Sequence, residues 1–207
     1  MKTSISTQDL TPGEFLATLP TGSYVRVSDL PGTPNAAKLA ASRAAAKGDI
    51  VALAKGLYFK GRLTQYGIAT PPPEEIALEV SGRLGVGPAG ISATRALGLT
   101  TQVPVNTELA TIFRPPTGIG GVHFVRRSNT RRLDLNYLEI ALLEVLRTWR
   151  LTVDGGWDAL VTAVRERVSK SDIRLDLVTS AAAREPNTEV RLAALKLADS
   201  LSKAHAR

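Results

Sequence analysis

The pattern of apolar and polar positions changes several times within the first seventy residues. A helix is predicted over 12–19, because Thr11 and Glu14 have the spacing of a capping box around a first-turn proline. Alternating positions over 24–27 predict a short strand, and residues 28–30 predict a brief second helix that ends at a proline. The chain therefore begins with helix, strand and helix in close succession.

An alanine-rich segment follows and predicts a third helix. Thr33 is expected to cap this helix and Gly48 to end it, and alanine has the highest intrinsic helix propensity. Leu39 and the alanines are expected to face the core, with the polar side chains outward. Two β-prone runs, 49–54 and 57–60, are separated by a lysine-glycine turn and predict a hairpin.

Composition favours two modest domains in an ordinary globular protein. The chain has 207 residues, of which 43% are apolar and 22% charged. The run Pro71-Pro72-Pro73 is a stiff spacer, so domains are predicted over 1–70 and 71–207. No run is apolar and long enough to span a membrane, and the first ten residues lack the apolar core of a signal peptide, so a cytoplasmic protein is expected.

Cofactor and metal chemistry find little support in the sequence. There is no cysteine, which excludes disulfides and thiolate metal sites. The two histidines, His123 and His205, lie far apart in sequence, so neither a metal site nor any other cofactor is predicted.

Positive charge is concentrated around the alanine-rich helix. The chain carries a net charge of +7, and residues 32–62 contain six basic residues against Asp49 alone, a local excess of +5. Helix, strand, helix, helix and hairpin is the order of a winged helix-turn-helix, whose last helix enters the major groove. The candidate DNA-binding residues are Thr33, Asn35, Lys38, Ser42 and Arg43 for the bases and Lys47, Lys55, Lys60 and Arg62 for the phosphates. Two alternatives stay open: the cations only solvate an exposed face, and Thr33 and Asn35 only cap the helix.

The segment after the proline run predicts a mixed region with a second basic cluster. Helices are predicted over 74–84 and 91–97, and two strands, 107–114 and 121–127, are expected to pair as a hairpin across a loop of proline and glycine. Guanidinium groups favour phosphate or carboxylate partners. Four arginines within seven residues form the candidate partner-binding site, with a solvated basic loop as the alternative: Arg126, Arg127, Arg131 and Arg132.

The last third of the chain predicts four helices. Asp134 is expected to cap a strongly apolar core helix. The apolar stripe of the last helix either packs on the protein's own core or forms a docking surface for a partner protein or a second copy. The predicted helices cover residues 136–150, 157–168, 171–183 and 188–204. The fold class is thus α+β: an N-terminal winged helix-turn-helix plus a C-terminal mixed α/β domain with a small antiparallel sheet and a helical bundle.

Residues 97–104, with the sequence LGLTTQVP, carry a resemblance to a known family. Together with Gly56-Leu57-Tyr58 at the end of the predicted hairpin, this motif is similar to the AbiEi-type antitoxins, and closest to the MenA-type antitoxins encoded beside nucleotidyltransferase-like toxins. The resemblance covers about residues 10–130. It implies a transcriptional repressor of its own operon that also neutralises a cognate toxin. From the residues alone, the TTQVP segment is interpreted as a turn whose hydroxyls and amide bond backbone groups.

An enzymatic function has no diagnostic motif. The glycines of 82–88 superficially resemble a phosphate-binding loop, but the lysine and the Ser/Thr that a P-loop needs are missing. No catalytic residue is therefore predicted. The alternative function is a catalytic antitoxin that modifies its toxin, for instance by phosphoryl transfer, and a third is a transcription factor without a toxin.

The expected partners are operator double-stranded DNA, the toxin encoded by the adjacent gene and, with no interface identified, a second copy of the chain.

Overall fold

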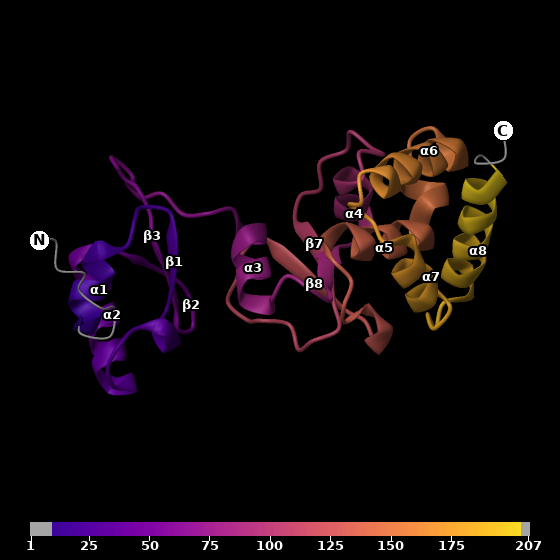
Figure 1. Cartoon of the computed structure of the whole chain (residues 1–207). Coiled ribbons are helices and arrows are strands. Elements are labelled where there is room, and N and C mark those ends of the chain that lie inside the picture. The colour runs from indigo at the N-terminus through magenta and orange to yellow at the C-terminus, as the bar shows by residue number, and fades with distance from the viewer. Residues whose placement is uncertain (1–9, 204–207) are drawn as a thin grey trace, which may run out of the picture. The chain divides into compact units, whose positions relative to one another are not determined.

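The computed structural model describes residues 10–203, and the chain divides into a compact unit that ends at Pro72 and another that begins at Pro73 (Figure 1). The predicted division lies two residues earlier, after residue 70. Both helices and small sheets are present, so the predicted α+β class is confirmed. The predictions made for residues 1–9 and for His205 lie outside the described residues.

The first unit contains the elements expected from its sequence in the expected order. Thr11 and Glu14 form the predicted capping box of α1, and Gly48 ends α2 in the left-handed conformation with φ of 79°. β3 lies between β1 and β2 and pairs antiparallel with both. The elements are α1 (Pro12–Thr18), β1 (Ser23–Arg26), the 3₁₀ helix η2 (Val27–Asp29), α2 (Pro34–Lys47), β2 (Val51–Ala54) and β3 (Leu57–Lys60).

The core of the first unit uses the small side chains of α2. Ala37 and Ala41 lie four residues apart on the face of α2 that packs inward, and both are fully buried. Leu39 was expected inward, which is wrong: it lies on a different face of the helix and is 48% exposed. The buried core consists of Leu16, Val25, Leu30, Ala37, Ala41 and Ile50.

A small hairpin that the sequence analysis did not predict follows β3. It consists of β4 (Leu63–Thr64) and β5 (Gly67–Ile68), and Tyr66 at its tip is 91% exposed. The chain passes Gly61 at the base of this hairpin, where an added Cβ would lie 2.2 Å from the carbonyl oxygen of Ala69. Only glycine fits this close approach of backbone to backbone.

The second unit contains a three-stranded sheet whose topology corrects the sequence analysis. β6 pairs antiparallel with β7, but β7 and β8 are parallel, so the predicted hairpin over these two strands is wrong. The connecting residues 112–121 are long enough to run back along β7, because a five-residue strand spans only about 17 Å. The elements are α3 (Pro73–Ser81), β6 (Val86–Pro88), α4 (Gly90–Ala96), β7 (Thr107–Thr111) and β8 (Val122–Arg126).

The remaining helices of the second unit pack around α5 (Figure 1), whose residues 139–146 are buried. Its N-cap is Asn136, which accepts hydrogen bonds from the backbone N–H groups of Leu138 and Glu139, so the prediction of Asp134 as the cap is wrong. The elements are the 3₁₀ helix η3 (Thr130–Arg132), α5 (Tyr137–Thr152), α6 (Gly156–Ser169), α7 (Leu175–Ala182) and α8 (Thr188–Lys203).

The apolar side chains of α8 lie in two environments, the core and the surface. Val190, Leu197 and Leu201 are buried in the core, as the first of the two sequence-based interpretations expected, whereas Leu192 and Leu195 remain exposed. Within residues 10–203, no helix has the length and apolar character that crossing a membrane requires.

Candidate functional site

The start of α2 is fixed by local hydrogen bonding. Thr33 accepts a hydrogen bond from the backbone N–H of Ala36 at 3.2 Å, and Pro34 occupies the first turn, where its missing N–H costs nothing. Thr33 is therefore a capping residue, as one of the two sequence-based alternatives had it. The side chain of Asn35 is exposed beside it.

The outward side of α2 carries the basic residues that the sequence predicted. Lys38 and Ser42 lie four residues apart on one line along α2, whereas Arg43 and Lys47 lie on another line about 140° around the helix. All four are exposed. Among residues 10–203, none of the three cations has an ion pair or a side-chain hydrogen bond. We call Lys38, Arg43 and Lys47 the exposed cations of α2.

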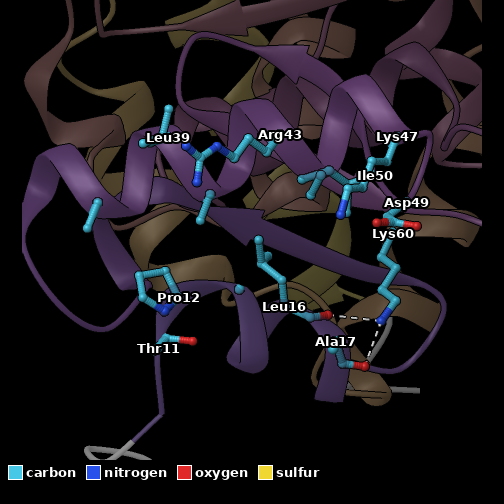
Figure 2. A pocket seen from close by; sticks show the side chains of 14 residues that line it. Thr11, Pro12, Leu16, Ala17, Leu39, Arg43, Lys47, Asp49, Ile50 and Lys60 are labelled. Carbon is cyan, nitrogen blue, oxygen red and sulfur yellow. Dashed lines mark hydrogen bonds between the residues drawn. The ribbon is translucent and has the colours of Figure 1, made fainter.

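The three cations predicted to contact phosphates outside α2 have different environments. Lys55, in the turn between β2 and β3, and Arg62, just after β3, are exposed. Lys60 is not available in the same way: its ammonium group donates hydrogen bonds to the carbonyl oxygens of Leu16 at 2.9 Å and Ala17 at 3.1 Å (Figure 2). These carbonyls belong to α1, near the end where a cation is favoured. Lys60 therefore holds α1 against the sheet, which corrects its assignment as a free phosphate contact.

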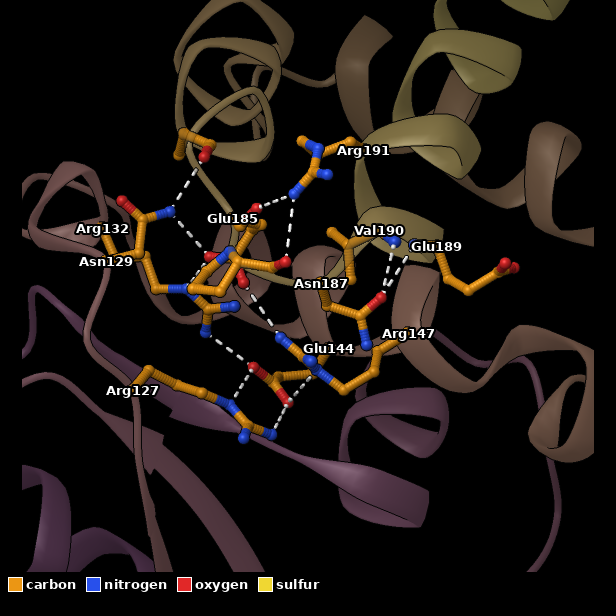
Figure 3. Close-up of polar contacts among 12 residues, drawn as sticks. Arg127, Asn129, Arg132, Glu144, Arg147, Glu185, Asn187, Glu189, Val190 and Arg191 are labelled. Atoms are coloured by element: carbon orange, nitrogen blue, oxygen red, sulfur yellow. Dashed lines mark hydrogen bonds and ion pairs between the residues drawn. The ribbon is translucent and has the colours of Figure 1, made fainter.

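The four arginines predicted as a partner-binding cluster do not form one surface. Arg126 and Arg131 are exposed, whereas the side chain of Arg132 is only 1% exposed. Arg132 donates from Nη1 to Glu144 at 2.6 Å and from Nε to Glu185 at 2.7 Å (Figure 3). Two carboxylates thus hold Arg132 inside the unit, so its assignment as a surface contact is wrong.

Two further arginines complete this buried arrangement. Arg127 donates to both oxygens of Glu144, from Nε at 2.9 Å and from Nη2 at 2.6 Å, and Arg147 donates from Nη2 to Glu185 at 2.9 Å (Figure 3). We call these three arginines and two glutamates the charge cluster. A sequence signal for it exists, because Glu144 lies within the apolar run of α5, and a glutamate in such a position needs a buried cation.

The charge cluster keeps its carboxylates ionised. Burial alone favours the neutral acid, but the hydrogen bonds and positive charges of Arg127 and Arg132 outweigh it and lower the pKa of Glu144. Burial likewise opposes ionisation of Glu185, and its bonds to Arg132 and Asn129 lower the pKa of that group. The arrangement is therefore a set of fixed ion pairs and not a proton donor.

The LGLTTQVP segment is anchored to the loop that follows α5. The backbone N–H of Asp154 donates to the carbonyl of Leu99 at 2.8 Å, and the hydroxyl of Thr100 accepts from the backbone N–H of Gln102 at 3.3 Å. The carboxylate of Asp154 also accepts from the backbone N–H of Thr101 at 3.4 Å. These bonds agree with the interpretation of the segment as a hydrogen-bonded turn.

The glycine segment 82–88 has a packing explanation. An added Cβ on Gly87 would lie 2.6 Å from Cβ of Ile140, so this glycine allows β6 to approach α5. Pro88 lies in the edge strand of the sheet, where a missing N–H is tolerated. Within residues 10–203, no group of three or more His, Asp or Glu side chains is placed to hold a metal ion.

Comparison with known proteins gives limited information on function. A family model described as "Family of unknown function (DUF6088)" matches residues 13–112. Among curated proteins, none matches the sequence. The crystal structure of the RV2827C protein from Mycobacterium tuberculosis is similar with 17% sequence identity and a TM-score of 0.47, covering 93% of this chain and 77% of that chain. The antitoxin function stays a prediction.

Proposed function

We propose that this protein is a cytoplasmic, DNA-binding antitoxin that represses its own operon and neutralises the nucleotidyltransferase-like toxin encoded beside it. In this proposal the first unit acts as a winged helix-turn-helix, with α2 as the recognition helix and the turn between β2 and β3 as the wing. The second unit binds the toxin.

The observation that supports the DNA-binding part is that, among residues 10–203, the exposed cations of α2 have no ion pair or side-chain hydrogen bond. Cations that have no carboxylate partner on the protein lose little when they exchange solvent and counterions for phosphates, and the released counterions favour binding. Lys38 and Arg43 extend from an alanine-rich helix, whose small side chains allow the helix to approach a groove closely. Lys55 in the turn after β2 supplies a second phosphate contact of the kind that a wing makes.

The toxin-binding part is supported by the resemblance of residues 97–104 to the AbiEi-type antitoxins and by two exposed surfaces of the second unit. Arg126 and Arg131, the exposed members of the predicted arginine cluster, are available to contact carboxylates or phosphates. Leu192 and Leu195 form a neighbouring pair of exposed apolar side chains on α8. These residues are the ones that we expect a toxin to contact.

DNA binding is tested by measuring the affinity for the DNA upstream of the gene at several salt concentrations. We expect the logarithm of the binding constant to fall linearly with the logarithm of salt concentration. Lys38→Ala and Arg43→Ala should each weaken binding by at least tenfold, while Arg165→Ala on α6 should leave it unchanged. Normal operator binding by both α2 variants would contradict the assignment of the recognition helix.

Toxin binding is tested by co-expressing the protein with the product of the adjacent gene and purifying through a tag on either partner. We expect a stable complex, growth protection by the wild-type chain, and retention of both by Arg43→Ala. Arg126→Glu with Arg131→Glu should weaken the complex without changing operator affinity. Neutralisation at substoichiometric protein, with an increase in toxin mass, would instead favour the catalytic alternative.

A further inference from the structure

A groove of about 600 Å³ lies between α1 and α2 in the first unit (Figure 2). Its walls are mostly apolar and include Pro12 and Leu16 on the α1 side, Leu39 on α2 and Ile50 before β2. The groove stays open because α2 faces α1 with alanines at 36, 40 and 44, whose side chains are too short to fill it. Its size and apolar character are those of small-molecule sites in proteins.

The rim of the groove is basic. Arg43 and Lys47 line it from α2, and in the part of the chain from 10 to 203 neither forms an ion pair. Among residues 10–203, Asp49 is the one acidic residue that lines the groove, and the ammonium of Lys60 is directed to carbonyl oxygens of α1 (Figure 2). An apolar cavity with two unpaired cations at its edge is complementary to an amphipathic anion.

We propose that the groove between α1 and α2 binds a small organic anion with an apolar body, such as a hydrocarbon carboxylate. The hydrocarbon part lies against Leu16, Leu39 and Ile50, and the anionic group meets Arg43 and Lys47. A neutral hydrocarbon of the same length gains the apolar contacts but not the charged ones. The site therefore discriminates by charge as well as by size.

Binding at this site also affects the function proposed above, and this part of the inference rests on that proposed function. Arg43 and Lys47 are two of the exposed cations of α2, so an anion held at the rim neutralises cations that DNA requires. The small molecule and the operator then bind antagonistically, because each lowers the affinity for the other by the same factor. The groove would make repression responsive to a metabolite.

The direct test uses 1-anilinonaphthalene-8-sulfonate, which fluoresces in apolar sites and carries one negative charge. We expect saturable binding that octanoate displaces at a concentration at least fivefold lower than octan-1-ol does, with acetate inactive. Arg43→Gln combined with Lys47→Gln should abolish the preference for octanoate over octan-1-ol. Lys38→Gln, on the same helix but outside the groove, should retain it.

Variants that fill the groove identify the site. Ala40→Phe and Ala36→Trp should each reduce binding of the dye at least tenfold, whereas Ala46→Trp, on α2 but not lining the groove, should not. Ala36 is exposed, so Ala36→Trp decides the question if Ala40→Phe does not fold. Dye binding equal to wild type in a folded Ala36→Trp variant would overturn the proposal.

The coupling to DNA is measured separately. Octanoate should weaken the operator complex at least threefold more than acetate at equal ionic strength, and this difference should be lost in Ala36→Trp. If the groove binds octanoate but operator affinity does not respond, the coupling is wrong. If the protein binds no DNA at any salt concentration, the proposed function fails, and the dye titrations still decide whether the groove is a ligand site.

Discussion

Arg132 and Glu144 form an ion pair inside the second unit, with Nη1 of the arginine 2.6 Å from Oε1 of the glutamate and both side chains 1% exposed. Residues 53 positions apart, Arg132 and Glu185, meet in the same cluster. This cluster joins η3, α5 and the segment that follows α7, so it couples three parts of the unit through charge. Its members support one another, because removing one leaves another charge buried without a partner.

We expect Arg132→Met to destabilise the second unit by about 3–5 kcal/mol, since Glu144 and Glu185 would lose a buried partner. Urea unfolding followed by tryptophan fluorescence measures this, because both tryptophans, Trp149 and Trp157, lie in the second unit. Arg131→Met, at the exposed neighbouring position, is the control and should change stability by less than about 0.5 kcal/mol. Equal unfolding midpoints for the two variants would show that the cluster contributes nothing.

The buried carboxylates also predict how stability depends on pH. Hydrogen bonds lower the pKa of Glu139, Glu144 and Glu185 in the folded chain, despite burial in each case. The side chain of an unfolded glutamate has a pKa of about 4.3. The stabilisation is therefore fully present above that value and is lost as the pH falls through the lower folded pKa values, because the unfolded chain binds more protons.

The measurement is the free energy of unfolding of the second unit between pH 7 and pH 3, again by tryptophan fluorescence. We expect a plateau above about pH 5 and a steep decrease below it. Glu189→Gln removes an exposed carboxylate that pairs with Arg150 and should leave the profile unchanged. A stability that stays constant from pH 5 to pH 3 would rule out the lowered pKa values.

Local signals predicted the first unit well, and the second unit shows why they are not sufficient. The capping box at Thr11 and Glu14 and the stop at Gly48 depend on residues close together in sequence, so the ends of α1 and α2 could be predicted. The parallel pairing of β7 with β8 depends instead on where a ten-residue connection passes, and the intervening sequence contains no signal for that path.

The candidate site follows the same division. The exposure of Lys38 and Arg43 follows from helix periodicity, so these two could be placed from the sequence. The interactions of Lys60 with α1, 43 and 44 residues away, and of Arg132 with Glu185 are contacts between distant segments. A basic residue in the sequence signals charge but not whether the fold leaves that charge exposed.

Gly87 tests the packing of the sheet against α5. We expect Gly87→Ala to destabilise the second unit by about 1–3 kcal/mol, because the new Cβ would lie 2.6 Å from Cβ of Ile140 and 2.7 Å from the carbonyl oxygen of Tyr137. Gly120→Ala is the matched control, since an added Cβ there meets nothing within 4 Å. Tryptophan fluorescence in urea distinguishes the two, and an unchanged midpoint for Gly87→Ala would mean that β6 can move away from α5 without cost.

Lys55 and Lys60 carry the same charge near the two ends of β3 and should nevertheless behave differently when each is replaced by methionine. Lys60→Met removes two hydrogen bonds to carbonyls of α1, so we expect a loss of about 1 kcal/mol in the first unit, measured by amide hydrogen exchange in α2 and β3. Lys55→Met should leave this exchange unchanged.

Operator binding should also distinguish Lys55→Met from Lys60→Met, but here Lys55→Met should have the effect and Lys60→Met should not. If Lys55 contacts one phosphate, its loss reduces the slope of log affinity against log salt by about 0.9, because about one fewer counterion is released. Lys60→Met should retain the wild-type slope, because its ammonium already donates to carbonyl oxygens of α1. Equal losses of slope in the two variants would mean that Lys60 leaves α1 to bind DNA. That result would contradict the prediction that Lys60 stays bound to the carbonyl oxygens of α1.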